Sequence, residues 1–363
     1  MTTNAQLQRT EPAIMPTGPD DRKMRREKFI GNFFGNNKDW SLKALPGDAS
    51  FRRYYRVMGH DTPLMLMEDS PDRPPVPPYV MVEPFQEIDR HLRRLGLNAP
   101  RIYAADLDQG LLLLDDFGEN TYTRLLNAGE NPKPLYELAV DVLIHLHNHP
   151  DRCDVDVPDY NVQQYINETL SFLDWYLPVV TGRTITNEAR EEWIEAWQKI
   201  LTHLPQDQKT LVLRDYHVDN MMLIFGETGL NKCGLLDFQD ALIGPYAYDL
   251  MSLLEDARRD MDENLYDYLL YDKYLPAIKG LDKQQFLKSF YILAAQRHAK
   301  VLGIFVRLFK RDDKPRYLSF LPHVHQLFTR ALQHNELQPL NDWFAKHQID
   351  ITNIPDTDRI QGA

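Results

Sequence analysis

Three polar residues in the second half of the chain lie at the ends of apolar, strand-like runs. Asp215 follows the run 211–213, Asn220 comes five residues later, and Asp237 ends the second strand of an expected hairpin. Phosphoryl transfer uses this order, because one carboxylate accepts the proton of an attacking hydroxyl while an Asn and a second Asp supply oxygen ligands to Mg²⁺. We predict Asp215 as the catalytic base and Asn220 and Asp237 as metal ligands. Taken singly, each is better explained as a turn former or a loop cap.

The elements that must position these residues fall into two regions. From about residue 40 to residue 118 the pattern is mostly strands separated by Gly, Asp and Pro, with one helix over 83–96. The Pro-rich segment 71–79 is expected to be a stiff connector. The expected strands are 40–45, 51–59, 63–69, 101–108 and 110–118.

From about residue 119 the apolar residues recur at three- and four-residue spacing, which is typical of helices. A β-hairpin around the turn 226–229 interrupts them. The helices are expected over 135–149, 162–177, 187–204 and much of 245–335. The whole pattern indicates an α+β protein. Its expected parts are a flexible tail 1–22, a strand-rich N-lobe 23–116, a helical C-lobe 117–340 and a C-terminal tail 341–363.

Composition excludes several classes of protein. The 363 residues include 41 Lys and Arg against 53 Asp and Glu, so the net charge of −12 argues against general nucleic-acid binding. No run of about 18 apolar residues is present, and the N-terminus lacks the hydrophobic segment of a secretory signal. Cys153 and Cys233 do not make a disulfide framework. We expect a cytoplasmic, monomeric protein that binds small molecules and neither nucleic acid nor membranes.

The two loops that carry these polar residues resemble those of a known family. "LRDYHVDN" and "LLDFQD" are similar to the catalytic and metal loops of the aminoglycoside phosphotransferases, which have the two-lobed protein-kinase-like fold. "GDASFRRYYRV", "LLDFQDALIGPYAYDLMSLLEDAR" and "QRHAKVLGIFVRL" resemble the anomeric amino-sugar kinases of bacterial cell-wall recycling. The resemblance covers residues 30–335. It implies a small antiparallel N-lobe sheet, a helical C-lobe, and ATP- and Mg²⁺-dependent phosphorylation of C1 of N-acetylmuramate or N-acetylglucosamine.

The resemblance also assigns the nucleotide side. The loop between the first two strands would cover the phosphates with Gly47, Asp48, Ala49 and Ser50. The backbone at Leu114 and Asp115 would meet the adenine edge, although the leucine run also fits a buried strand. Asp249 would brace the catalytic loop.

The chain departs from the family pattern at three positions. Leu213 and Arg214 replace a usual His and a common Gly before the catalytic Asp. The third strand carries methionines where kinases place a phosphate-binding lysine. The candidates to replace it are Arg52, Arg53 and Arg56, of which we select Arg53 for the nucleotide. Strand alternation puts Arg52 and Arg56 on one face and Arg53 on the other.

The acceptor side is predicted from residue types. Arg297, Lys300, Ile304 and Arg307 share one helix face, which would suit the lactyl carboxylate of N-acetylmuramate or would equally be a solvated basic face. Glu168 could hydrogen-bond a sugar and Trp175 could stack on it, although Trp175 also fits a core position. The remaining acceptor candidates, from the catalytic and metal loops, are Tyr216, His217, Asp219 and Gln239.

Four further alternatives stay open. Glu87 could form the ion pair that kinases make from a helix, or could lie on a solvated face. The acidic run 255–264 would suit the polycationic acceptor of an antibiotic kinase, and the missing lysine would suit a nucleotide-binding pseudokinase. The histidines of 145–153 could be metal ligands, but an ordinary helix end explains them better.

Overall fold

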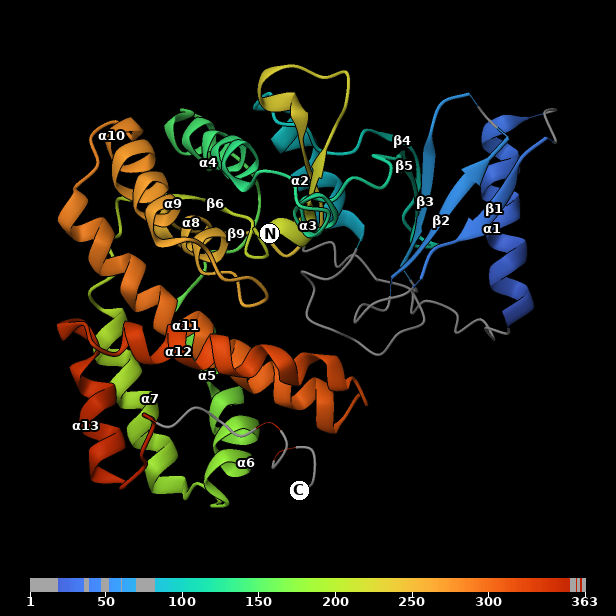
Figure 1. Cartoon of the computed structure of the whole chain (residues 1–363). Coiled ribbons are helices and arrows are strands. Elements are labelled where there is room, and N and C mark those ends of the chain that lie inside the picture. Colours follow the sequence, from blue (N-terminus) through green and yellow to red (C-terminus); the bar gives the residue numbers. More distant parts are fainter. Residues whose placement is uncertain are drawn as a thin grey trace, which may run out of the picture. The chain divides into compact units, whose positions relative to one another are not determined.

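The computed structural model describes residues 19–35, 39–46, 52–59, 61–69 and 82–352, with residues 357 and 360. The chain divides into two compact units, described separately below: an N-terminal unit of residues 1–83 and 100–118, and a C-terminal unit of residues 84–99 and 119–363 (Figure 1). The predictions for Gly47, Asp48, Ala49 and Ser50, and for the connector 71–79, lie outside the described residues.

The N-terminal unit is a five-stranded antiparallel sheet covered on one face by a helix (Figure 1). The strand order is β1-β2-β3-β5-β4. All five strands lie where the sequence predicts them. The elements are α1 (Pro19–Phe34), β1 (Ser41–Ala44), β2 (Arg53–Met58), β3 (Leu64–Glu68), β4 (Ile102–Asp106) and β5 (Leu111–Asp115).

Alternation along the strands separates the two faces of this sheet. Ile30 of α1 packs on one face, against Tyr55, Val57, Leu64, Leu66, Leu111 and Leu113. Arg53, two residues before Tyr55, is on the same face of the sheet as these residues, whereas Arg56 is on the opposite face.

The C-terminal unit is mostly helical, and its helices begin at polar caps. An Asn, Asp or Thr side chain accepts the N–H of a first-turn residue at the start of six helices, which satisfies donors that the helix itself leaves unpaired. These caps are Thr121, Asn131, Asn161, Thr186, Asp262 and Asp282.

The elements of the C-terminal unit include two π-helical segments, η2 and η5. Its helices are α2 (Val82–Arg94, whose first two residues fall in the N-terminal unit), α3 (Tyr122–Asn127), α4 (Pro132–Asn148), α5 (Val162–Ser171), η2 (Phe172–Tyr176), α6 (Leu177–Thr181), α7 (Asn187–Leu201), α8 (Ala247–Leu254), α9 (Glu263–Asp267), η5 (Tyr268–Tyr274), α10 (Leu275–Ala277), α11 (Lys283–Lys310), α12 (Leu321–Ala331) and α13 (Gln338–Lys346). Short 3-10 turns are η3 (Val218–Asn220), η4 (Gly229–Lys232), η6 (Pro315–Phe320) and η7 (Asn335–Leu337).

Two short antiparallel ribbons hold the polar loops of this unit. β6 (Lys209–Val212) pairs with β9 (Leu242–Pro245), and β7 (Met221–Leu223) pairs with β8 (Cys233–Leu235). The β7–β8 hairpin is predicted from the sequence, but β9 is not. The four residues of β9 show no alternation of apolar and polar side chains, so the strand is recognised only from its pairing with β6, which is distant in the sequence.

Three predicted boundaries need correction. Nearly all of α2 belongs to the C-terminal unit, where Phe85 stacks on Phe238 with ring centroids 4.8 Å apart. The C-terminal tail does not begin at 341, because α13 continues to Lys346 and the buried Trp343 donates to the Ala189 carbonyl at 2.8 Å. The N-terminal tail is also shorter than predicted, since α1 begins at Pro19.

The long helix α11 forms the centre of the C-terminal unit, with α5, α8 and α12 packed against it. It crosses the end of α5 at Gly303, where an added Cβ would lie 2.2 Å from the Ser171 carbonyl. The Ser171 hydroxyl donates to the Lys300 carbonyl at 3.0 Å. This close crossing places the Lys300 side chain opposite Glu168.

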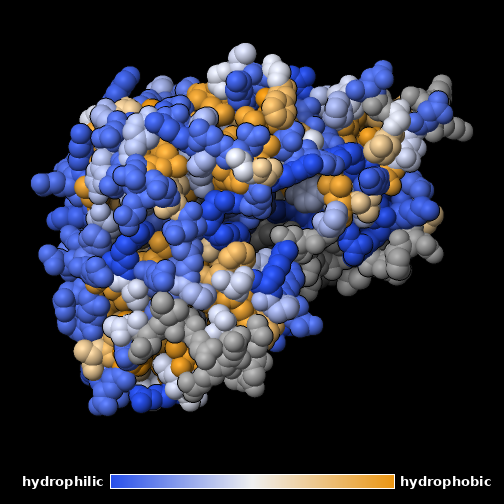
Figure 2. All heavy atoms as spheres, in the orientation of Figure 1, coloured by the Kyte–Doolittle hydropathy of each residue, from blue (hydrophilic) through white to orange (hydrophobic). Residues whose placement is uncertain are grey.

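Hydrophilic residues cover most of the face drawn in Figure 2, and hydrophobic residues form separate smaller patches between them. Among the described residues, no helix is both long enough and apolar enough to cross a membrane.

Candidate active site

The loop after β6 is held by a buried carboxylate. Asp249, on α8, is 1% exposed, and its two oxygens accept the backbone N–H groups of Leu213 at 2.6 Å and Arg214 at 2.9 Å. The predicted bracing role of Asp249 agrees with these contacts. Since the next residue is Asp215, the brace fixes the backbone that presents this carboxylate.

Asn220 and Asp237 are neighbours across the β7–β8 ribbon. The Leu236 N–H donates to the Asn220 carbonyl at 3.0 Å, which places the following residue, Asp237, beside Asn220. The Asn220 Nδ2 donates to the Asp215 carbonyl at 2.9 Å, so its amide oxygen points away from that contact. Asp237 has φ 58°, in the left-handed region, and its Oδ1 accepts from Gln239 at 2.9 Å.

These two side chains fit the magnesium ion that the fold implies. A carboxylate and an amide oxygen are hard donors, and Mg²⁺ is commonly bound by one or two such groups together with water and substrate phosphates. Among the described residues, no group of three or more His, Cys, Asp and Glu could hold a metal ion.

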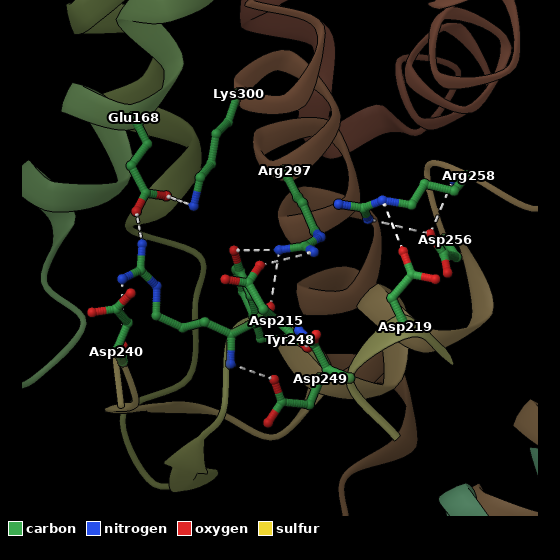
Figure 3. Close-up of polar contacts among 12 residues, drawn as sticks. Glu168, Asp215, Asp219, Asp240, Tyr248, Asp249, Asp256, Arg258, Arg297 and Lys300 are labelled. Carbon is green, nitrogen blue, oxygen red and sulfur yellow. Dashed lines mark hydrogen bonds and ion pairs between the residues drawn. The ribbon is translucent and has the colours of Figure 1, made fainter. Parts of the chain in front are cut away.

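The cation beside Asp215 comes from α11 (Figure 3). Arg297 Nη2 lies 3.5 Å from Asp215 Oδ1, and the Asp215 side chain is 44% exposed. Burial works against the ionised carboxyl, but the charges of Arg297 and Lys300 outweigh it and hold the pKa of Asp215 well below its usual range. Asp215 is therefore ionised and able to accept a proton.

Glu168 is the centre of an ion cluster that links three elements (Figure 3). Its Oε1 pairs with Arg214 at 2.5 Å and its Oε2 with Lys300 at 3.2 Å. Tyr160 and Gln296 also donate to Oε2, at 2.5 and 3.1 Å. Four donors fill the acceptor capacity of a carboxylate. The contacts argue against the prediction that Glu168 binds the sugar directly.

Three more acceptor candidates are buried. Tyr216 is 3% exposed and donates to the Ala139 carbonyl at 2.8 Å, so its side chain is part of the core. His217 is also buried, and Gln239, 3% exposed, donates to the predicted metal ligand Asp237. Membership of the catalytic and metal loops led to these predictions, but the sequence did not show that these side chains are buried. Trp175, in η2, is partly exposed and stays a candidate.

Asp219, an acceptor candidate on the catalytic loop, forms an ion pair that is not predicted from the sequence. Asp219 accepts a hydrogen bond from Thr123 and pairs with Arg258 Nε at 3.2 Å (Figure 3). Arg258 also lies 3.7 Å from Asp256. The run 255–264 was considered for its acidic residues. Its sequence spacing does not predict that Arg258 reaches the catalytic loop.

On the nucleotide side, the geometry argues against Arg53. It lies on the face of the sheet that α1 covers, whereas Arg56, on the other face, pairs with Asp116. Leu114 is buried, and the Asp115 N–H donates to the Arg101 carbonyl at 3.0 Å. If adenine binds at the predicted hinge, it must therefore hydrogen-bond to backbone atoms other than the Asp115 N–H.

The remaining candidates agree with the simpler alternatives. Glu87 is exposed on α2. His145 contacts the Leu95 carbonyl at 2.6 Å, and His147 contacts the Tyr274 hydroxyl at 2.6 Å. These histidines are structural parts of a helix end, as predicted.

The fold and this arrangement of Asp215, Asn220 and Asp237 define a kinase-like phosphotransferase. A model described as the phosphotransferase enzyme family matches residues 41–280. The chain belongs to this family.

Relatives and solved structures extend the comparison. N-acetylmuramate/N-acetylglucosamine kinase from Caulobacter vibrioides is 31% identical over 356 residues, covering 90% of this chain and 97% of the relative. The protein of the same name from Pseudomonas aeruginosa is 34% identical over 327 residues, covering 88% and 92%.

Two solved structures share the fold. Aminoglycoside phosphotransferase APH(2'')-Ib with ADP bound has a TM-score of 0.54 at 16% identity, over 85% of this chain and 97% of that chain. Choline kinase LicA from Streptococcus pneumoniae has a TM-score of 0.57 at 13% identity, over 86% and 99%. These likenesses confirm the predicted two-lobed, kinase-like α+β fold.

Proposed function

We propose that this protein is an ATP- and Mg²⁺-dependent kinase that phosphorylates the anomeric C1 hydroxyl of N-acetylmuramate, N-acetylglucosamine or both. The observation that carries the proposal is the position of the Asp215 carboxylate, 3.5 Å from Arg297 and in the loop whose backbone Asn220 contacts, with Asp237 beside Asn220. The curated relatives that match 84–90% of the chain are all named for these two sugars. A supply of ATP would place the reaction in the cytoplasm, and the product would enter cell-wall synthesis.

In this mechanism Asp215 orients the acceptor hydroxyl and takes its proton. A base of low pKa suffices, because the proton leaves late in a loose transition state and an anomeric hydroxyl is more acidic than an ordinary alcohol. Asn220 and Asp237 would hold Mg²⁺, which neutralises charge on the nucleotide phosphates when it is bound. Arg297 positions Asp215 by its ion pair at 3.5 Å.

The charges around Asp215 favour this acceptor over a polycationic antibiotic. Arg297 and Lys300 give the side facing α11 a cationic character, which suits a neutral or carboxylated sugar. Two of the acids that supported the antibiotic are already paired: Glu255 with His298 at 2.7 Å, and Asp256 with Arg258. A pseudokinase would have no use for all three of Asp215, Asn220 and Asp237.

A coupled ADP-release assay tests the proposal. Purified protein receives ATP and Mg²⁺ with N-acetylmuramate, N-acetylglucosamine, glucose or an aminoglycoside, and the variant Asp215→Asn is measured in parallel. We expect turnover of the N-acetylated sugars and its loss in the variant. Turnover of the aminoglycoside alone would reassign the acceptor, and ATP binding without turnover of any acceptor would support the pseudokinase.

A further inference from the structure

Arg214, the residue before Asp215, has a backbone conformation that side chains rarely adopt. Its φ of 67° lies in the left-handed region, which costs free energy for a residue with a Cβ and persists where the surroundings enforce it. Its N–H donates to Asp249 at 2.9 Å, and its carbonyl accepts from Arg297 Nη1 at 3.0 Å. Partners on both sides thus fix this peptide.

The Arg214 side chain explains why an arginine occupies this position. Its Nη2 pairs with Glu168 on α5 at 2.5 Å, and its Nη1 donates to the carbonyl of Asp240, in the loop that carries Asp237, at 3.4 Å. A glycine would adopt the same φ without strain but would make neither contact. The guanidinium therefore connects the catalytic loop to α5 and to the metal loop.

Glu168 balances the cations near the reacting carboxylate. Arg214 and Lys300 pair with Glu168, and Arg297 pairs with Asp215. Burial works against ionisation, but Lys300 and Arg214 hold the pKa of Glu168 below its usual range, so it is charged. Without this charge Lys300 would lose the acid with which it pairs, and its positive charge already acts on Asp215.

We propose that Glu168 is a positioning residue for phosphoryl transfer, acting through Arg214 and Lys300 rather than on the acceptor. By binding Arg214 it fixes the position of the Asp215 backbone relative to the loop that carries Asp237. By binding Lys300 it keeps a competing ammonium off Asp215, so that this carboxylate remains open to the acceptor hydroxyl. The inference rests on the proposed function, because it assigns Asp215 as the base.

The test compares Glu168→Gln, Arg214→Gly and the double variant. Gln keeps the size of Glu168 without its charge, and Gly suits the φ of Arg214. The matched control is Glu192→Gln, which removes an acid that pairs with Lys346 and His347 elsewhere in the unit. We expect Glu168→Gln to lower kcat about 100-fold, as a small misplacement of a catalytic group does, with the KM for ATP and sugar within about threefold of wild type.

Because Glu168 acts partly through Arg214, the double variant should lose much less than the product of the two single losses. An unchanged kcat in Glu168→Gln, or multiplied losses in the double variant, would overturn the proposal. A raised sugar KM with normal kcat would also overturn it, since Glu168 would then be a direct sugar ligand.

Hydrogen exchange gives a readout that needs no turnover. The Leu213 and Arg214 amides should lose protection in Glu168→Gln and keep it in Glu192→Gln. If the wild-type protein phosphorylates no amino sugar, the proposed function fails, but this comparison still decides the inference. Unchanged protection in Glu168→Gln would overturn it.

Discussion

Single residues in this site divide into the proposed reacting group, Asp215, and the residues that hold its surroundings in place. The Asp215 carboxylate is 44% exposed, whereas Asp249 behind it is 1% exposed. Asp249 binds two backbone N–H groups, and Gln239 binds the predicted metal ligand Asp237. We therefore expect substitutions of Asp249 and Gln239, as well as of the proposed base, to affect activity.

Asp249 predicts a pH dependence. Burial raises its pKa to about 7, although the Leu213 and Arg214 N–H groups favour the ionised form. Both oxygens must accept for the loop to keep its shape, and a protonated carboxyl has a donor in place of one acceptor. We expect kcat to rise between about pH 6 and about pH 8 with an apparent pKa near 7. A flat profile would contradict this role, and Asp249→Asn should remove the dependence.

Ionisation of Asp249 also affects stability: as the pH rises, we expect the free energy of unfolding to fall while kcat rises. The folded pKa of Asp249, about 7, exceeds the ordinary value of 3.8, so the native state binds the proton more tightly than the unfolded chain does between these pH values. The stability that Asp249 contributes is full below about pH 4 and is lost as the pH rises through 7. Relative to Asp249→Asn, the free energy of unfolding from urea titrations should therefore decrease from about pH 5 to about pH 7. An increase would contradict the raised pKa.

The contact between Gln239 and Asp237 leads us to expect that substituting Gln239 weakens Mg²⁺ binding. Since the Nε2 of Gln239 donates to Asp237 Oδ1 at 2.9 Å, we expect Gln239 to orient the predicted metal ligand Asp237 and not to bind the sugar. Gln239→Ala should raise the Mg²⁺ concentration needed for half-maximal activity by about 10-fold to 100-fold, with the sugar KM unchanged. Magnesium titrations of kcat measure this, and a change confined to the sugar KM would restore Gln239 as a substrate ligand.

At the scale of elements, α11 and α5 set the positions of the charges. Arg297 and Lys300 come from α11, and Glu168 comes from α5. The two helices meet closely at Gly303 and Ser171, one turn beyond Lys300 and Glu168. The spacing of the ion cluster therefore depends on a helix crossing that tolerates no side chain at residue 303.

Gly303→Ala tests this crossing. A Cβ would lie 2.2 Å from the Ser171 carbonyl, so the helices must separate, at a cost of about 1–3 kcal/mol in the free energy of unfolding. Activity should fall as well, because Lys300 and Glu168 would separate. The control is Gly31→Ala in α1, where the nearest neighbour of a Cβ would be Trp40 at 3.8 Å. Urea unfolding should show no loss in this control, and equal losses in both variants would contradict the argument.

At the scale of the whole molecule, the sequence predicted what depends on local pattern. The five strands of the N-terminal sheet and the loops with Asp215, Asn220 and Asp237 follow from residues close together in the chain. The Glu168–Arg214–Lys300 cluster did not, because its members lie 46 and 86 residues apart and meet only through tertiary packing. Strand β9 and helix α13 were missed for the same reason, since β6 and α7 complete them.

The position of the new phosphate on the sugar tests the central claim most directly. N-acetylglucosamine carrying ¹³C at C1 is incubated with ATP, Mg²⁺ and the protein, and the product is examined by ³¹P NMR. We predict a phosphorus signal split by coupling to the labelled C1, and no product from Asp215→Asn. A phosphorylated sugar without this coupling would place the phosphate on another hydroxyl and contradict an anomeric kinase. No sugar phosphate from wild type with either N-acetylglucosamine or N-acetylmuramate would contradict the sugar kinase itself.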